Sequence, residues 1–162
     1  MNENVAVYPG SFDPITFGHL DILSRGLELF DKVIVAIANN IEKKALFTVE
    51  ERKDLIQKSI NGNPKVIIDS FEGLLVDYVK RIDAPFVIRG LRAMSDFEFE
   101  FQMASMNRSL NPEMDTLFMM TSKDYFFVSS RTIKEVAAFG GPVNEFVPEV
   151  VVRSLKEKFS QR

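Results

Sequence analysis

The 162-residue chain contains no cysteine and only one histidine. Without thiols it can form no disulfide, no thiolate metal site and no cysteine nucleophile. A single imidazole likewise excludes a metal site built from several histidines. Acidic side chains outnumber basic ones, with a formal net charge of −3, so the sequence offers no broad positive surface for nucleic acid. Any cationic groups at a functional site must therefore act locally.

Long apolar segments are also missing from the sequence. No apolar run approaches the roughly 18 residues of a membrane span, and the first residues, Met1-Asn2-Glu3-Asn4, do not resemble a signal peptide. We therefore expect a cytoplasmic protein without membrane partners. A hydrophobic content of 46% and a charged content of 27% are ordinary for a soluble globular protein. The length predicts a single domain over residues 1–162.

Apolar runs and helical patterns alternate along the chain. Short apolar runs predict buried strands at 5–8, 33–38, 66–68, 86–88 and 117–120. Apolar residues at helical spacing predict helices at about 19–30, 48–60, 74–82, 132–139 and 148–159. Thr48 and Glu51 have the spacing of a capping box at the start of the second helix. This order predicts an α/β fold, a doubly wound five-stranded parallel sheet with helices on both faces.

Residues 95–111 carry two conflicting patterns. The alternation of phenylalanine and glutamate over 97–101 favours a strand. Ser95 and Glu98 instead have capping-box spacing, and apolar residues continue at helical spacing in two stripes: Phe97, Phe101 and Ala104, and Phe99, Met103 and Met106. We expect a helix with two apolar faces, of which one lies on the sheet. The second face favours self-association, and the alternative is burial within the same domain.

The first turn of the predicted sheet carries the one histidine. Residues 8–19, Tyr-Pro-Gly-Ser-Phe-Asp-Pro-Ile-Thr-Phe-Gly-His, join the first strand to the first helix. A helix N-terminus presents unpaired N–H groups and a dipole that favours anions, so His19 lies where a phosphate would bind. The chain has no G-x-G-x-x-G, no Walker-type loop and no G-x-S-x-G. The remaining Thr16-x-Gly18-His19 match is weak by itself, because a lone histidine there is often a cap or a surface residue.

The motif has companions in a fixed order along the chain. Residues 9–19 resemble the signature of the nucleotidyltransferase superfamily that uses an H/T-x-G-H motif. Further segments then follow: Lys43-Lys44, Phe47-Thr48-x-Glu50-Glu51-Arg52, Ile88-Arg89-Gly90-Leu91-Arg92, Asp96-Phe97-Glu98-x-Glu100, Met106-Asn107-Arg108, and Val128-Ser129-Ser130 leading to Ile133-Lys134-Glu135-Val136-Ala137. In this order and spacing, over essentially the whole chain, the sequence resembles the bacterial phosphopantetheine adenylyltransferase family.

The resemblance implies a Rossmann-like nucleotidyltransferase fold and a defined reaction. The adenylyl group of ATP would pass reversibly to 4′-phosphopantetheine, giving dephospho-coenzyme A and pyrophosphate in coenzyme A biosynthesis. The acceptor phosphate would attack the α-phosphate in line, without a covalent enzyme intermediate, so that positioning and charge stabilisation supply the rate. The resemblance also implies Mg²⁺ as the partner of ATP, coenzyme A as a feedback ligand and a homohexamer. No protein ligand for the metal is evident in the sequence.

The resemblance also assigns roles to individual residues. His19, Lys43 and Arg92 would be catalytic, with His19 stabilising the transition state as a hydrogen-bond donor. The acceptor would contact Ser11, Lys43, Leu75 and Arg89. ATP would contact Ser11, Phe12, His19, Gly90, Leu91, Arg92, Glu100, Tyr125, Phe126, Phe127, Val128, Ser129, Ser130 and Arg131. By residue type alone, Lys43 is an ordinary loop lysine, Glu100 a helix-surface glutamate and Leu75 an apolar residue at a helix start.

Two questions stay open at this point. Arg131 stands where the family often has Ser or Thr, and it could reach the β- and γ-phosphates or turn outward. The superfamily also contains enzymes that use nicotinate mononucleotide, or CTP with glycerol phosphate, although the segments at 88–92 and 96–100 would then be unexplained. A non-catalytic adenine-nucleotide sensor is the third possibility, but a sensor does not need His19, Lys43 and Arg92 together.

Overall fold

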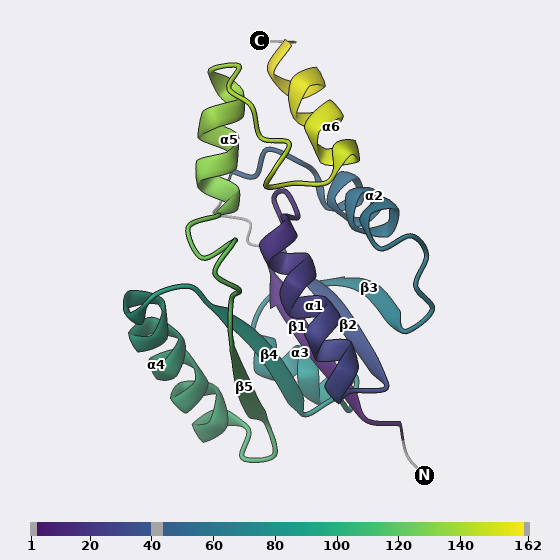
Figure 1. Cartoon of the computed structure of the whole chain (residues 1–162). Helices are drawn as coiled ribbons and strands as arrows, with labels where there is room; N and C mark the ends of the chain where they lie inside the picture. Colours follow the sequence, from purple (N-terminus) through teal and green to yellow (C-terminus); the bar gives the residue numbers. More distant parts are fainter. Residues whose placement is uncertain (1–2, 40–43, 161–162) are drawn as a thin grey trace.

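A computed structural model describes residues 3–39 and 44–160 of the chain. Within these residues, five parallel strands form one sheet in the order β3-β2-β1-β4-β5. The strands are β1 (Val5–Gly10), β2 (Lys32–Ala38), β3 (Val66–Phe71), β4 (Phe86–Leu91) and β5 (Asp115–Met120). The helices are α1 (Phe17–Leu29), α2 (Val49–Ser59), α3 (Leu75–Arg81), α4 (Met94–Leu110), α5 (Ser130–Ala138) and α6 (Glu149–Ser160). The predicted doubly wound parallel sheet is confirmed (Figure 1).

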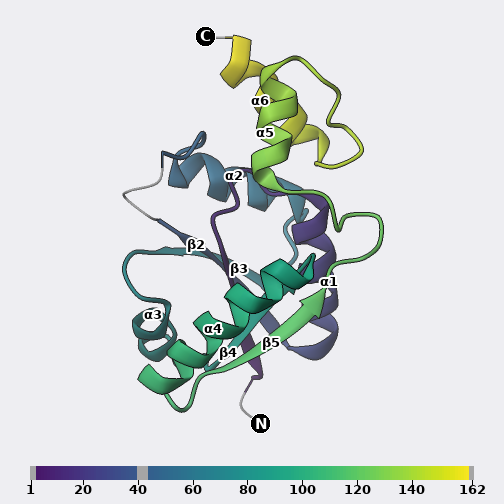
Figure 2. The same ribbon diagram turned by 90° about the vertical axis from the view of Figure 1, so that its left-hand side faces the viewer.

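Side chains alternate between two cores on the two faces of the sheet. Ala6, Val33 and Ile88 belong to the larger core, which they form with α1, α2, α5 and α6. Neighbouring residues such as Val7 and Val87 face the smaller core, which includes the apolar side of α3. Helix α4 lies along β4 and β5 (Figure 2). Its Phe97 ring meets Phe118 of β5 edge-on. Helices therefore cover both faces, as parallel strands require.

Strands β1, β3 and β4 extend beyond their predicted carboxyl ends, to Gly10, Phe71 and Leu91. The β2–β3 ladder continues through Asp69 and Ser70 to Phe71, and the β4–β5 ladder continues through Arg89 and Gly90. A prediction based on apolar runs does not include these polar positions. Backbone hydrogen bonds, and not side-chain hydrophobicity, hold a strand end in the sheet. The polar ends of β1 and β4 lie at the carboxyl edge of the sheet, where ligands bind in such folds.

Helix α4 confirms one prediction and corrects another. Residues 94–110 are helical, as the 3.6-residue spacing indicated, but the capping box predicted for Ser95 and Glu98 is wrong. The N-cap is Ala93, and no side chain caps the helix. Ser95 lies inside the first turn, where its backbone is already helical and its hydroxyl cannot act as an N-cap.

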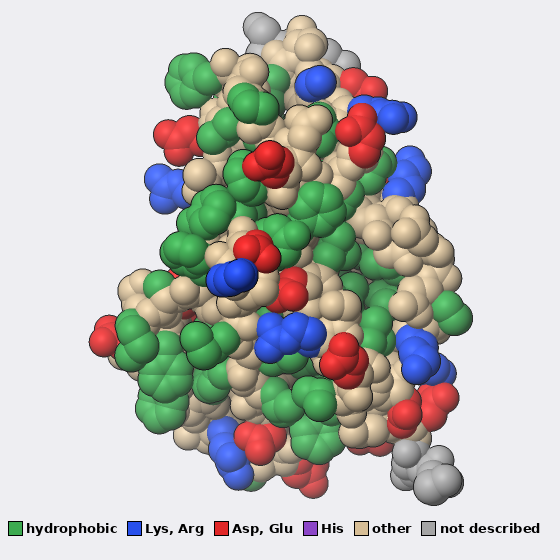
Figure 3. All heavy atoms as spheres, in the orientation of Figure 1, with side chains coloured by type: hydrophobic (Ala, Val, Ile, Leu, Met, Phe, Trp, Pro, Cys, Tyr) green, Lys and Arg blue, Asp and Glu red, His purple; other side chains and the backbone are tan. Residues whose placement is uncertain are grey.

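The outer face of α4 is exposed in this chain. None of the described residues of α4 is buried, and Phe99 and Met106 are 62% and 58% exposed. Hydrophobic side chains gather over α4 in the space-filling view (Figure 3). This apolar surface contains the second predicted stripe, Phe99, Met103 and Met106, together with Leu110 and with Phe101, which belongs to the other predicted stripe. Within the described part of the chain, no helix is long and apolar enough to cross a membrane.

Candidate active site

The turn between β1 and α1 ends in a reciprocal cap. The Thr16 hydroxyl accepts a hydrogen bond from the His19 backbone N–H at 3.3 Å, and the Thr16 backbone N–H donates to His19 Nδ1 at 3.0 Å. Nδ1 therefore carries a lone pair, since a backbone N–H can only donate. In the neutral ring the proton must then lie on Nε2. The cap fixes the tautomer of His19, and its Nε2–H has no hydrogen-bond acceptor among the residues that the structure describes.

Burial and charge keep this imidazole neutral. Burial, assisted by the nearby guanidinium groups of Arg92 and Arg89, lowers the pKa of His19 to about 4. The ring packs edge-on against Phe12, with centroids 5.0 Å apart, which restricts its orientation. At neutral pH the side chain is thus an oriented, uncharged hydrogen-bond donor.

A cleft of about 580 Å³ opens in front of His19 at the carboxyl edge of the sheet. It is lined by the ends of β1 and β4, the first turns of α1 and α4, and the segment before α5. Twelve of the predicted site residues line it: Ser11, Phe12, His19, Arg89, Gly90, Arg92, Glu100, Tyr125, Val128, Ser129, Ser130 and Arg131. The structure therefore brings together residues that lie up to 120 positions apart in sequence, from Ser11 to Arg131.

Four of the predicted residues that the structure describes do not line this cleft. Leu75, Leu91, Phe126 and Phe127 are described but lie outside its lining. Leu75 packs against the smaller core at the start of α3. Lys43 lies outside the described residues. Arg131 lines the cleft with an exposed side chain.

Arg89 is held by a carboxylate on the neighbouring helix. Its Nε donates to Glu100 Oε2 at 2.7 Å, a second guanidinium N–H donates to Glu100 Oε1, and a third reaches the Pro9 carbonyl at 2.8 Å. Glu100 is largely buried, with a side chain 13% exposed. In this structure its partner is therefore Arg89, in a bidentate pair that fixes the guanidinium plane.

Arg92 joins two walls of the cleft. Its Nε donates to Asp96 Oδ2 at 3.1 Å on α4, and another guanidinium N–H donates to the Val128 carbonyl at 3.3 Å. Asp96 also accepts the backbone N–H of Arg92 at 3.2 Å. The cation is thereby positioned between the end of β4 and the segment that precedes α5.

The start of α5 forms the opposite wall. The Ser129 hydroxyl accepts the backbone N–H of Thr132 at 3.0 Å and caps the helix, while the Ser130 hydroxyl donates to the Pro14 carbonyl at 2.7 Å. The N-termini of α1 and α5 therefore border one cleft, together with that of α4. Their backbone N–H groups favour a polyanion between them.

Sequence reasoning missed several residues of the lining: Tyr8, Thr16, Gly18, Ile22, Ser95, Asp96, Phe99 and Thr121. Helical spacing could not have identified the pair of Asp96 with Arg92, because Arg92 lies before the start of α4. Tyr8 gave no signal, because it reads as a strand residue. Burial raises the pKa of the Tyr8 hydroxyl, so it stays protonated.

The described residues offer no ready-made metal centre. Residues 3–39 and 44–160 contain no group of three or more His, Cys, Asp or Glu side chains placed to hold an ion. The carboxylates of the cleft, Asp96 and Glu100, are each paired with an arginine. The site therefore consists of cations, oriented N–H groups and hydroxyls, which suits stabilising charge on phosphates.

Comparison with known proteins agrees with this chemistry. A family model described as cytidylyltransferase-like matches residues 7–136. Solved structures of a bifunctional NMN adenylyltransferase/ADP ribose pyrophosphatase from Francisella tularensis and a putative nicotinate-nucleotide adenylyltransferase from Vibrio parahaemolyticus share the fold at 15% identity. Their TM-scores are 0.74 and 0.71, and the matches cover 98% and 96% of this chain and 50% and 99% of theirs. The fold and cleft define a nucleotidyltransferase of the cytidylyltransferase-like class.

Sequence relatives narrow the class. A phosphopantetheine adenylyltransferase from Syntrophotalea carbinolica is 56% identical over 98% of this chain and 96% of its own. One from Geobacter metallireducens is 54% identical over 99% of both chains. The chain belongs to the phosphopantetheine adenylyltransferase family, an enzyme family of coenzyme A biosynthesis.

Proposed function

We propose that the cleft transfers the adenylyl group of ATP to 4′-phosphopantetheine by direct in-line attack on the α-phosphate, releasing pyrophosphate. The observation that carries this proposal is the neutral, oriented His19, whose free Nε2–H lies with Arg89 and Arg92 in one cleft. Donors fixed before the reaction stabilise charge that develops at phosphate oxygens without reorganisation. No nucleophile of the protein is needed, because the acceptor phosphate attacks.

The roles divide between the two walls of the cleft. ATP would lie between the N-termini of α1 and α5, with its phosphates near His19, Ser129 and Ser130. Arg89, at the end of β4, would face the acceptor phosphate, and Arg92 would contact the nucleotide. Lys43, which would bridge the two reacting phosphates, and Leu75, which would contact the pantetheine arm, stay predictions from the family resemblance.

We further propose that Mg²⁺ enters with ATP. The carboxylates of the cleft already pair with arginines, so the ion would be held mainly by phosphate oxygens and water. A structural neighbour from Francisella tularensis was solved with AMP and a manganese ion, with 14% identity and a TM-score of 0.69. Activity that requires a divalent cation, with Mg²⁺ and Mn²⁺ compared, is the expected result.

Self-association and feedback complete the proposal. The exposed apolar face of α4 supports contacts between copies of the chain, and we propose the homohexamer that the family resemblance implies. Coenzyme A contains a pantetheine arm and an adenylate, so it would compete for the same cleft. Light scattering of the purified chain measures its mass, and inhibition by coenzyme A that rises as ATP falls would support competition. A cytoplasmic location and the absence of nucleic-acid partners stay predictions.

A pyrophosphate-release assay tests the reaction. The full chain is supplied with ATP, Mg²⁺ and one acceptor at a time: 4′-phosphopantetheine, nicotinate mononucleotide or glycerol phosphate. We expect release only with 4′-phosphopantetheine. Turnover with another acceptor would contradict the assigned substrate, and ATP binding without any turnover would favour a nucleotide sensor. The same assay with Arg131→Ser distinguishes the two orientations of Arg131. A raised KM for ATP indicates a phosphate contact, and an unchanged KM indicates an outward side chain.

A further inference from the structure

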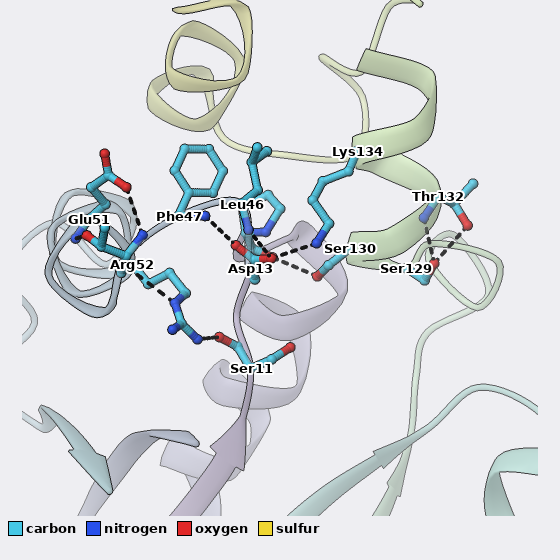
Figure 4. A network of polar contacts seen from close by, with 12 residues as sticks. Ser11, Asp13, Leu46, Phe47, Glu51, Arg52, Ser129, Ser130, Thr132 and Lys134 are labelled. Carbon is cyan, nitrogen blue, oxygen red and sulfur yellow. Dashed lines mark hydrogen bonds and ion pairs between the residues drawn. The ribbon is translucent and has the colours of Figure 1, made fainter. Parts of the chain in front are cut away.

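A buried carboxylate lies in the turn that carries the active site but faces away from the cleft. Asp13 is only 5% exposed. Its Oδ1 accepts the Phe47 N–H at 2.8 Å, and its Oδ2 accepts both the Leu46 N–H at 3.0 Å and the Lys134 ammonium at 2.6 Å (Figure 4). Neither Asp13 nor its partners line the cleft. A buried carboxylate with three hydrogen-bond donors is stabilised by them. Removing one donor would cost folding stability, because the charge would then be buried without a full set of partners.

The partners of Asp13 belong to two segments that flank the turn between β1 and α1, residues 11–16, which we call the phosphate turn. Leu46 and Phe47 lie just before α2, three and four residues after Lys43. Lys134 lies one turn into α5, four residues after Ser130. The Ser130 hydroxyl donates to the Pro14 carbonyl, so α5 contacts two consecutive residues of the turn, through its positions 130 and 134.

A third contact holds the same turn from the side of α2. A guanidinium N–H of Arg52 donates to the Ser11 carbonyl at 2.8 Å, and Arg52 is itself 4% exposed (Figure 4). The turn is thus fixed between α2 and α5 by side chains of which, among the described residues, only Ser130 lines the cleft. Among residues 3–39 and 44–160, Asp13 alone joins the turn to both neighbours, because its carboxylate bonds to the segment before α2 and to α5.

We propose that Asp13 and Lys134 are a positioning pair, which holds the N-terminus of α5 against the phosphate turn so that both helix N-termini meet ATP. Neither residue touches the reacting atoms. This inference rests on the proposed placement of ATP between α1 and α5. It predicts that breaking the pair weakens ATP binding much more than it weakens acceptor binding, because Arg89 and β4 lie outside the network.

The decisive variant is Lys134→Met, which keeps the length of the side chain and removes the charge. A charge-assisted hydrogen bond typically contributes enough for about a tenfold change in an equilibrium constant, so we expect the KM for ATP to rise about tenfold. The KM for 4′-phosphopantetheine should stay within about twofold, since its contacts are not displaced. Calorimetric titration of ATP into the full chain should show the same loss without turnover.

The chain offers a matched control in Lys158. This lysine joins α6 to α2 through Glu51 at 2.7 Å, and its side chain is 30% exposed, against 28% for Lys134. Lys158→Met removes an ion pair away from the cleft whose carboxylate is more exposed, 41% for Glu51 against 6% for Asp13. The Lys158 ammonium also lies 5.6 Å from the Phe47 ring centroid. In the described part of the chain it makes no bond to Asp13 or α5, and we expect both KM values to stay unchanged. If Lys134→Met left the KM for ATP unchanged, or if both lysine variants raised it equally, the positioning role would be overturned.

A double variant separates positioning from stability. Asp13→Asn leaves the Lys134 ammonium without its counter-ion and should lower the thermal midpoint, which adding Lys134→Met should partly restore. The KM for ATP should stay high in the double variant because the link to α5 is still missing. Recovery of ATP binding together with stability would overturn the proposal.

A second variant and the wild-type control keep the test of the positioning pair decisive. Should Lys134→Met give no folded protein, Lys134→Gln, which keeps a donor without the charge, replaces it. We expect a smaller rise of about threefold in the KM for ATP, and no rise overturns the inference. An inactive wild-type chain would contradict the proposed function instead, so the two failures are distinguishable.

Discussion

Helices α1 and α2 begin with the same local arrangement but use it differently. Each has a threonine N-cap and a reciprocal bond to the third helical residue, Thr16 with His19 and Thr48 with Glu51. The second polar atom of that residue makes the difference. Glu51 directs its other oxygen to Lys158 on α6, whereas His19 keeps Nε2 for the cleft. One capping motif thus stabilises a helix, and its counterpart also orients the imidazole that faces the cleft.

The largest expected effect separates these two uses at position 19. His19→Ala should lower kcat by about 10²- to 10³-fold with little change in either KM, because a donor aimed at developing charge acts mainly in the transition state. His19→Gln provides the control, since glutamine at this position can keep the capping box. We expect it to retain stability and still lose most of kcat. Steady-state kinetics and urea unfolding measure both, and near-normal turnover in His19→Ala would refute the role of the ring.

A second test uses the pH. Because the folded-state pKa of His19 is lowered to about 4 from an ordinary 6.5, only the unfolded chain takes up this proton between those values. Stability of the wild type should therefore fall relative to His19→Gln as the pH drops through this window. The chain has one histidine, so its ring resonances in NMR need no assignment. A ring that titrates near 6.5 in the folded protein would contradict its burial.

The smallest effect is expected at the structural cap. Glu51→Ala removes the reciprocal bond and the pair with Lys158, which should lower the free energy of unfolding by about 1 kcal/mol and leave kcat unchanged. The side-chain hydrogen bond from Lys158, with the backbone bond at Thr48, lowers the pKa of Glu51. Its contribution is present above the ordinary carboxyl pKa and is lost as the pH falls through the lowered one. Urea unfolding at neutral and acidic pH measures this difference in stability. A fall in kcat would contradict the purely structural role of Glu51.

The two caps also illustrate what the sequence could predict. The Thr48 box was found because Thr and Glu stand three residues apart, the usual pattern. The Thr16 box was missed because histidine occupies the third position. The Arg89–Glu100 pair could not be foreseen, since it joins a strand to a helix across eleven residues. Periodicity predicted the sheet and the helix at 95–111, whereas polar strand ends such as Asp69-Ser70 required the backbone ladder to be seen.

The site residues divide along the same line. The family resemblance identified most of the residues that line the cleft, because the order of its motifs reflects the whole fold. Asp13 and Lys134 stood within those motifs without an assigned role, since their contacts bridge 121 positions and depend on tertiary packing. Local patterns identify groups that face a ligand better than groups that hold other groups in place.

The bidentate pair of Arg89 and Glu100 has a consequence for substrate exchange. A phosphate that reaches Arg89 meets a guanidinium whose N–H groups already contact a carboxylate. Docking there is a competition between two anions, so the affinity reflects their difference and not the full attraction of a bare cation. The arginine is also held in place beforehand, which limits the entropy lost on docking. If the acceptor phosphate docks at Arg89 as proposed, this contact would bind it less tightly than an unpaired arginine would, and so would favour release of the product.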